Sequence, residues 1–173
     1  MLFLLIDCQI NIRYIYKKMI RYALCYSLAQ FESIVHAYPE IARGKFSPYG
    51  TGKACVISIG DSMSSHPLKG SQYILNVDFD DCSYSESGLS PISDETARRI
   101  VDFIDEMNDT REILFVHCTA GISRSQAVIR YVLDIFGESS IVTRASNPCL
   151  TPNMDVLSAL KHQKYLKLYN ISE

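Results

Sequence analysis

The sequence predicts a single α/β domain with a mainly parallel central sheet flanked by helices. Short apolar runs alternate along the chain with longer segments whose apolar residues recur at helical spacing, which is typical of strands joined by helices. The chain has 173 residues, of which 47% are hydrophobic and 21% charged. This length and composition suit one domain with a substantial core. The sequence contains no internal repeat, low-complexity tract or long linker.

The first expected strand, residues 22–26, is short, apolar and partly aromatic. Ser27 and Gln30 follow it at the spacing of a capping box, which predicts a helix to about residue 38. The proline at the next position ends that helix, because proline lacks a backbone N–H group. Glycine and proline then predict a loop over residues 43–53.

The later elements alternate in the same way. Apolar runs predict strands over residues 54–59, 73–79 and 113–116. Helices are expected in three later segments, which are Ser93 to about residue 107, residues 124–136, and Pro152-Asn153 to about residue 168. Ligands of such sheets bind outside the carboxyl ends of the strands, so a site is expected directly after a strand.

Charge and cysteine usage exclude several classes of protein. The net charge of -2 and the pI of about 6.1 provide no global attraction to nucleic acid or an anionic membrane, so neither is expected as a partner. The six cysteines and four histidines show no CxxC pair or zinc-ligand spacing, so no metal or other cofactor is expected. Cysteines within apolar runs favour a reducing, cytoplasmic compartment over a disulfide framework.

Residues 1–18 are expected to be an N-terminal extension, and residues 19–173 the folded domain. Asp7 interrupts the apolar start too early for a signal peptide or a membrane span. Basic residues at Arg13 and Lys17 follow the apolar stretch, which reverses the order found in signal peptides. An additional packed helix is the alternative for this segment.

The segment HCTAGISRS, residues 117–125, lies between an expected strand and an expected helix. Backbone N–H groups of such a loop and the N-terminus of the helix together form an anion-binding arrangement. Gly121 permits the conformation that turns these amides inward, and the planar guanidinium of Arg124 suits two phosphate oxygens. The same positive field favours the thiolate of Cys118, which makes this sulfur the candidate nucleophile.

The remaining positions of the loop have supporting roles. Ser125 is expected to donate a hydrogen bond to the sulfur and to help it leave when a phosphoenzyme is hydrolysed. His117 is expected to face the other way and to orient the loop, without acting as a base. The expected substrate-binding positions are Thr119, Ala120, Gly121, Ile122, Ser123 and Ser125.

The pattern H-C-x-x-G-x-x-R-S resembles the signature of the protein tyrosine phosphatase superfamily, and HCTAGISRS is close to its dual-specificity form. Residues 151–153, TPN, resemble the start of the helix that follows the phosphate loop in dual-specificity phosphatases. Val156 and Ala159 depart from that pattern, since Phe and Gln are common there. The resemblance spans about residues 54–168 and includes small phosphatase-like proteins of bacteria and phages. It implies a dual-specificity phosphatase-like fold.

The resemblance also implies a general acid, because the superfamily uses an aspartate from a loop before the cysteine. Asp81 is the candidate, since it follows an expected strand and lies 37 residues before Cys118. Asp80 is the alternative, because the pattern alone does not separate adjacent loop positions. Asp78 is also a candidate by position, but it lies within the expected strand, where its side chain can face either side. Glu86 is a remote third choice.

Together these residues predict a phosphomonoester hydrolase that forms a cysteinyl-phosphate intermediate and acts on a phosphorylated protein or peptide, as a tyrosine or dual-specificity phosphatase does. The alternatives are a catalytically weak phosphoprotein-binding module and a phosphoinositide or RNA 5′-phosphatase of the same superfamily. Uncharged residues within the loop disfavour the lipid phosphatase, because lipid-directed members often carry lysines there. Cys82 and Cys149 are candidate oxidative partners of Cys118, although inert thiols are favoured at both positions.

Overall fold

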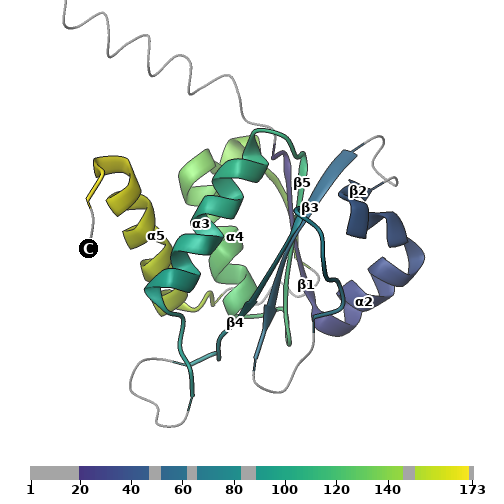
Figure 1. Ribbon diagram of the computed structural model, residues 1–173, viewed down its shortest axis with the longest axis horizontal. Coiled ribbons are helices and arrows are strands. Elements are labelled where there is room, and N and C mark those ends of the chain that lie inside the picture. Colours follow the sequence, from purple (N-terminus) through teal and green to yellow (C-terminus); the bar gives the residue numbers. More distant parts are fainter. Residues whose placement is uncertain (1–19, 47–51, 62–65, 83–88, 146–150, 172–173) are drawn as a thin grey trace, which may run out of the picture.

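A central sheet runs through the molecule, and helices cover both of its faces (Figure 1). The computed structural model of the chain describes residues 20–46, 52–61, 66–82, 89–145 and 151–171. The expected extension over residues 1–18 lies outside these ranges.

Within the described residues the sheet contains β1 (Tyr22–Ser27), β2 (Lys45–Phe46), β3 (Gly52–Gly60), β4 (Ile74–Asp78), β5 (Ile113–Cys118) and β6 (Val142–Ala145). Their order is β2-β3-β5-β1-β6, and β4 also pairs with β3. The β2–β3 pair is antiparallel and the other pairs are parallel, which confirms the mainly parallel sheet. Two strands were not expected from the sequence. Strand β2 is very short, and β6 has a partly polar sequence and pairs with β1 at the edge of the described sheet.

The helical segments are α2 (Leu28–Ala37), η1 (Pro39–Arg43), α3 (Asp94–Asn108), α4 (Arg124–Phe136), η2 (Glu138–Ser140) and α5 (Met154–Tyr169). Each expected cap is present: Ser27 forms the capping box with Gln30, Ser93 accepts from Thr96, and Asn153 begins α5. The proline after α2 begins a 3-10 turn, where the expectation was only a stop. In the described part of the chain, no helix is long and apolar enough to cross a membrane.

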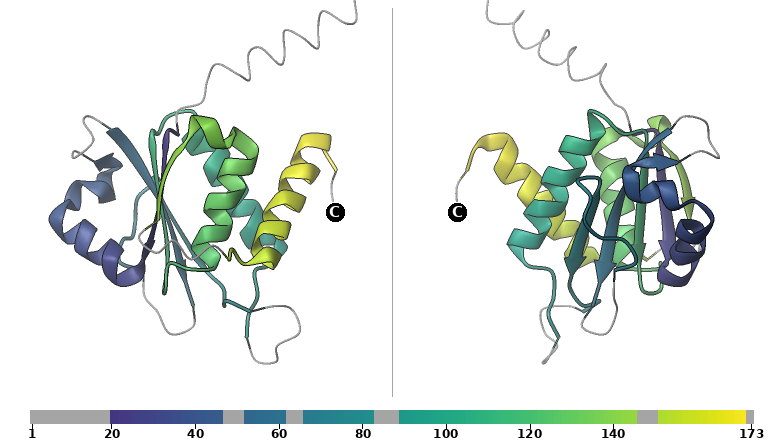
Figure 2. Two further views of the ribbon diagram at one scale, coloured as in Figure 1. Left: turned by 180° about the vertical axis from the view of Figure 1, so that it is seen from behind. Right: turned by 45° about the vertical axis from the view of Figure 1, so that its right-hand side comes forward.

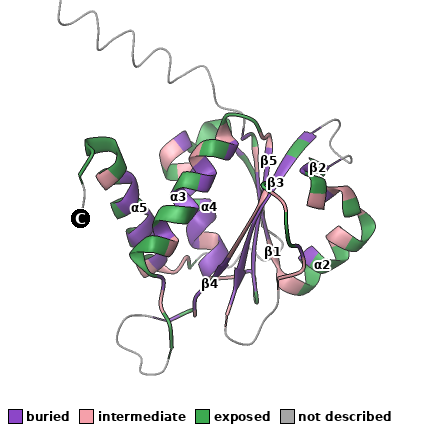
Figure 3. Ribbon diagram, in the orientation of Figure 1, coloured by how far each residue is buried: buried purple, intermediate pink, exposed green. Residues whose placement is uncertain are grey.

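The sheet separates two layers of helices. Helix α2 and η1 lie on one face, and α3, α4 and α5 lie on the other (Figures 1 and 2). Alternate residues of β5 therefore enter different cores: Phe115 packs near Phe31 on the α2 face, whereas Leu114 and Val116 join the core on the α3–α5 face. Burial is concentrated in the strands and on the inner faces of the helices (Figure 3). Because β5 is buried on both faces, its end is a rigid place for a reactive group.

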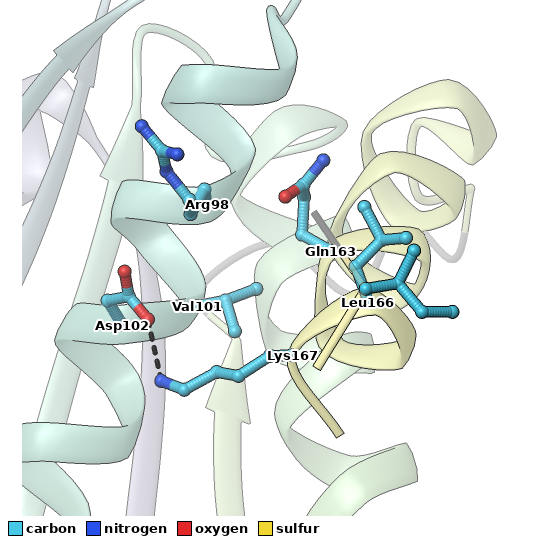
Figure 4. Close-up of a pocket in the computed structure, with 7 residues that line it drawn as sticks. Arg98, Val101, Asp102, Gln163, Leu166 and Lys167 are labelled. Atoms are coloured by element: carbon cyan, nitrogen blue, oxygen red, sulfur yellow. Dashed lines mark hydrogen bonds and ion pairs between the residues drawn. The ribbon is translucent and has the colours of Figure 1, made fainter. Parts of the chain in front are cut away.

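Ion pairs fix α5 against α3. The Lys164 ammonium lies 2.8 Å from the Asp105 carboxylate. Figure 4 shows the second ion pair, in which the Lys167 ammonium lies 2.6 Å from the Asp102 carboxylate. A pocket of about 430 Å³ lies between these helices, and its lining includes Arg98, Val101, Gln163, Leu166 and Ile171. This docking matters for the site, because the N-terminus of α5 adjoins the loop before α4: the N–H of Asn153 donates to the carbonyl of Ser123 at 3.2 Å.

Candidate active site

The loop between β5 and α4 turns tightly against the end of β1. Gly121 has a φ of +71°, and a Cβ at this position would lie 2.5 Å from the backbone nitrogen of Ser27 and 2.6 Å from the carbonyl carbon of Tyr26. The start of α2 also holds the loop, since the N–H of Leu28 donates to the carbonyl of Thr119 at 3.2 Å. Glycine is therefore required at position 121 both by the conformation and by the close backbone approach.

Cys118 ends β5, and only 1% of its surface is exposed. Its Sγ accepts a hydrogen bond from the N–H of Gly121 at 3.2 Å and lies 3.1 Å from the hydroxyl oxygen of Ser125. A thiolate cannot donate, so Ser125 must donate to the sulfur when Cys118 is ionised. Two donors thus converge on this atom.

The guanidinium of Arg124 is held in place by strand ends. Its Nη1 donates to the carbonyls of Gly60 and Phe79 at 2.9 and 2.6 Å. Its Nη2 donates to Asp61 Oδ2 at 3.3 Å and to Thr119 Oγ1 at 3.2 Å. The buried Nε has no hydrogen-bond partner in the described part of the chain. Because Nε and Nη2 share one edge of the planar group, that edge retains an unsatisfied donor suited to an anionic oxygen.

Asp61 is a site residue that the sequence analysis missed. Its Oδ2 forms the ion pair with Arg124 and also accepts a hydrogen bond from the hydroxyl of Thr119 at 2.7 Å. The carboxylate orients the arginine and ties it to the first residue of the loop. Its position directly after β3, which adjoins β5, was the available signal, because parallel strands end at the same edge of the sheet.

The two candidate acids have different surroundings. Asp81 Oδ1 accepts hydrogen bonds from Ser123 Oγ and Asn153 Nδ2, both at 2.8 Å. Asp80 instead forms two hydrogen bonds with Ser90. Its N–H donates to the carbonyl of Ser90 at 2.7 Å, and its Oδ2 accepts from the N–H of Ser90 at 2.8 Å. Of these neighbours, Asp81 is the one that contacts the loop. Glu86 lies outside the described residues.

The other loop positions differ in exposure. Thr119 and Ala120 are exposed, Ile122 and Ser123 are half-buried, and Ser125 is buried. Ser123 occupies the N-cap of α4, yet its side chain makes no capping hydrogen bond. Its hydroxyl donates to Asp81 instead, so no side-chain oxygen of the N-cap covers the first amides of α4.

His117 lies on the opposite face of the sheet from the α4 layer. Its ring stacks on Phe31 with the ring centroids 4.4 Å apart. Neither ring nitrogen has a hydrogen-bond partner among the described residues, so the expected orienting role is not exerted through a hydrogen bond. Burial lowers the pKa of His117 to about 3, and the nearby His66 adds to this effect. The imidazole is thus neutral and acts as a packing group.

The structure also places the two residues that depart from the phosphatase pattern and cysteines other than Cys118. Val156 and Ala159, which depart from the phosphatase pattern, are buried in α5 where it packs on α3 and α4, with 1% and 9% exposure. Cys82 is buried directly after Asp81, and Cys149 lies outside the described residues. The sequence analysis also missed Cys25, whose Sγ lies 3.2 Å from Ser125 Oγ.

No protein-family model and no curated protein sequence matches the chain. The structure is similar to that of the human tyrosine phosphatase-like serine/threonine/tyrosine-interacting protein, with 20% identity over 68% of this chain and 80% of that one, and a TM-score of 0.46. It is also similar to Tk-PTP in the active form, with 15% identity over 85% of this chain and 97% of that one, and a TM-score of 0.43.

A third similar structure is PTPMT1 in complex with PI(5)P, with 15% identity over 68% of this chain and 80% of that one, and a TM-score of 0.39. At these identities the likeness concerns the fold.

Proposed function

We propose that the chain is a phosphomonoester hydrolase that works through a cysteinyl-phosphate intermediate, with phosphorylated proteins or peptides as substrates. The observation that carries this proposal is the buried Nε donor of Arg124, which has no hydrogen-bond partner among the described residues. It lies beside a loop whose Cys118 sulfur is close to two hydrogen-bond donors. A buried donor without an acceptor is costly, and a phosphoryl oxygen would satisfy it. The site thus combines a dianion clamp with a nucleophile.

In the proposed first step, the Cys118 thiolate attacks phosphorus in line with the ester bond. Arg124 and the loop amides hold the equatorial oxygens, where the charge of the transition state is spread. The S–P bond forms as the P–O bond breaks, and Asp81 gives its proton to the departing oxygen. Ser123 and Asn153 both donate to Oδ1 of Asp81, which leaves Oδ2 to carry that proton.

In the proposed second step, Asp81 has become a carboxylate and removes a proton from water as the water oxygen attacks phosphorus. The S–P bond breaks, and its electron pair returns to the sulfur of Cys118. The hydroxyl of Ser125, 3.1 Å from that sulfur, stabilises the charge that develops there. Inorganic phosphate is released, and the enzyme returns to its starting state.

The loop chemistry favours a protein phosphatase over a lipid phosphatase within this proposal. Thr119, Ala120, Ile122 and Ser123 carry no charge, so Arg124 is the cation of the loop sequence, and the backbone adds only neutral N–H donors. A polyanionic headgroup would gain little here beyond its one bound phosphate. The preference among phosphotyrosine, phosphoserine and phosphothreonine is part of the test.

The test is turnover of p-nitrophenyl phosphate and of phosphotyrosine, phosphoserine and phosphothreonine peptides, with vanadate as inhibitor. We expect hydrolysis by the wild type, loss in Cys118→Ser, and a trapped phosphoenzyme on Cys118 after acid quenching. Retention of phosphopeptides without phosphate release would instead favour a binding module. Efficient release from phosphoinositide or RNA 5′-phosphate with none from peptides would overturn the assigned substrate class.

A further inference from the structure

The hydroxyl of Ser125 lies between two sulfur atoms. Cys118 Sγ is 3.1 Å from Ser125 Oγ on one side, and Cys25 Sγ is 3.2 Å from it on the other. Cys25 comes from β1, next to β5 in the sheet, and is 1% exposed, while Ser125 is fully buried. Cys25 also lies 3.7 Å from the carbonyl oxygen of Gly121. Two cysteines and one serine thus form a buried chain of contacts that leads from β1 to the nucleophile.

The number of protons fixes the direction of this chain. A serine hydroxyl has one proton to donate, and a thiolate on Cys118 has none. When Cys118 is ionised, the Ser125 proton therefore points at Cys118, and the hydrogen bond between Cys25 and Ser125 then requires the Cys25 thiol as its donor. At 3.2 Å, Ser125 Oγ is a nearer acceptor for that thiol than the Gly121 carbonyl at 3.7 Å. A hydroxyl that accepts one hydrogen bond is a better donor for the next, because hydrogen bonds in a chain polarise one another.

We propose that Cys25 is a positioning residue of this site, whose thiol donates to Ser125 and thereby directs the serine proton to the sulfur of Cys118. This role rests on the proposed function, because it concerns the thiolate that attacks and later leaves phosphorus. Cys25 acts through Ser125 and contacts neither the substrate nor its phosphorus atom.

The ionisation of Cys25 agrees with a donor role. Burial raises the pKa of its thiol to about 11, the hydrogen bond with Ser125 opposes that rise, and the charge of Cys118 adds to it. Cys25 is therefore protonated at neutral pH and always has a proton to donate. Among the described residues, the charged groups bonded to the loop are Arg124 at the start of α4, Asp61 after β3 and Asp81 after β4. Each of them is present in every variant of the test.

The hydrogen-bond relay from Cys25 through Ser125 to Cys118 matters most in the second step of the proposed reaction, the hydrolysis of the cysteinyl phosphate. Breaking the S–P bond places negative charge on Cys118 while the sulfur is still buried, and Ser125 is the side-chain donor at that atom. Without Cys25, the Ser125 hydroxyl could turn toward another acceptor, and thiolate departure would slow. Hydrolysis of the intermediate is then expected to fall more than its formation.

The experiment follows site-specific alkylation of Cys118 by iodoacetamide against pH, with peptide mass spectrometry to separate Cys118 from the other cysteines. We expect Cys25→Ala to shift the midpoint of the profile to higher pH and to slow alkylation at pH 6 about two- to ten-fold, the equivalent of one hydrogen bond. Cys25→Ser keeps a donor and should restore the wild-type profile. Turnover should show a larger burst and a smaller kcat for Cys25→Ala.

Two controls separate the relay from a packing effect. Cys55→Ala removes another fully buried thiol beside β5, one that donates to the carbonyl of Ile113, and it should leave the profile unchanged. In a Ser125→Ala background, Cys25→Ala should have no additional effect, because Cys25 acts through the serine. If Cys25→Ala does not fold, Cys25→Val fills the space without a donor and replaces it.

An unchanged Cys118 profile in folded Cys25→Ala or Cys25→Val would overturn the relay. The relay would also be overturned if Cys25→Ala changed the alkylation profile equally in the wild type and in the Ser125→Ala background. The alkylation profile requires no turnover, so its result is independent of the proposed function. Absence of phosphate release by the wild type would reject the proposed hydrolase activity. Identical alkylation profiles in the wild type and the Cys25 variants would reject only the role of Cys25.

Discussion

The side-chain amide of Asn153 donates a hydrogen bond to the carboxylate of Asp81 at 2.8 Å, although 72 positions separate the two residues. The same asparagine caps α5, since its Oδ1 accepts from the N–H groups of Asp155 and Val156, both at 3.0 Å. One residue thus links the start of α5 to the candidate general acid. The helix pairing between α3 and α5 holds it there.

Substitutions at these positions should separate capping from the positioning of the acid. We expect Asp81→Asn to lower kcat about 100-fold or more, as loss of a general acid does, with little effect on vanadate affinity. Asn153→Ala should lower kcat about ten-fold and also destabilise the fold by about 1 kcal/mol, because the cap is lost. Asn153→Ser keeps a capping oxygen but is too short to reach Asp81, so it should lower kcat with less loss of stability.

Asp80→Asn is the matched control for the candidate acid. Among the described residues, the Asp80 carboxylate bonds to the N–H of Ser90, and no hydrogen bond joins it to the loop that contains Cys118. Its turnover should stay close to that of the wild type. The measurements are steady-state kinetics, vanadate inhibition and urea unfolding. If Asp80→Asn were the inactive variant and Asp81→Asn active, the acid would be assigned to the wrong neighbour.

The turn at Gly121 gives a second prediction. Gly121→Ala would force a Cβ to within 2.5 Å of the Ser27 nitrogen at a φ of +71°, so β1 and the loop must separate. We expect a loss well above the roughly 1–2 kcal/mol that the left-handed conformation alone costs, and loss of vanadate binding. Gly70→Ala isolates the conformational part, since Gly70 has a φ of +73° and nothing within 4 Å of its added Cβ. Equal unfolding midpoints for the two variants would contradict this account.

The buried His117 predicts a pH dependence of stability. Its folded pKa of about 3 lies below the ordinary value of 6.5, so between these pH values the unfolded chain binds a proton that the folded chain does not. Its contribution to stability is therefore fully present above pH 6.5 and falls as the pH drops toward 3, by up to about 1.4 kcal/mol per pH unit. His117→Phe keeps the stacking on Phe31 and should flatten the dependence. Urea unfolding at several pH values measures this slope, and identical slopes in both proteins would refute it.

Much of the fold was predictable because its signals are local. The apolar run of β5, the capping box at Ser27 and the cap at Asn153 each lie within a few residues of the element they specify. The motif around Cys118 was equally readable, since loop and helix are contiguous. Strand β6 was not predictable, because it is short and partly polar and forms by pairing with β1.

The missed site residues reach the loop through tertiary structure. Asp61 contacts Arg124 across 63 positions, and Cys25 contacts Ser125 across 100 positions. Proximity in sequence to the acid segment and to the last helix suggested Cys82 and Cys149 as thiols of interest. The parallel register of β1 with β5 instead brings Cys25 behind the nucleophile. Such neighbours depend on strand order, which the spacing of residues within one segment does not encode.

The pairing of Asp61 with Arg124 gives the last prediction, in which two effects oppose each other. The arginine side chain is 5% exposed, so loss of its counter-charge in Asp61→Asn should cost about 2 kcal/mol in the unliganded protein. In Asp61→Asn, a bound dianion replaces the negative charge that the Arg124 guanidinium has lost. It also no longer competes with the Asp61 carboxylate for that guanidinium. Vanadate should therefore raise the Tm of Asp61→Asn by more than it raises that of the wild type. Thermal unfolding with and without vanadate tests this, and a smaller shift in the variant would mean that Asp61 serves mainly to orient Arg124 for the anion.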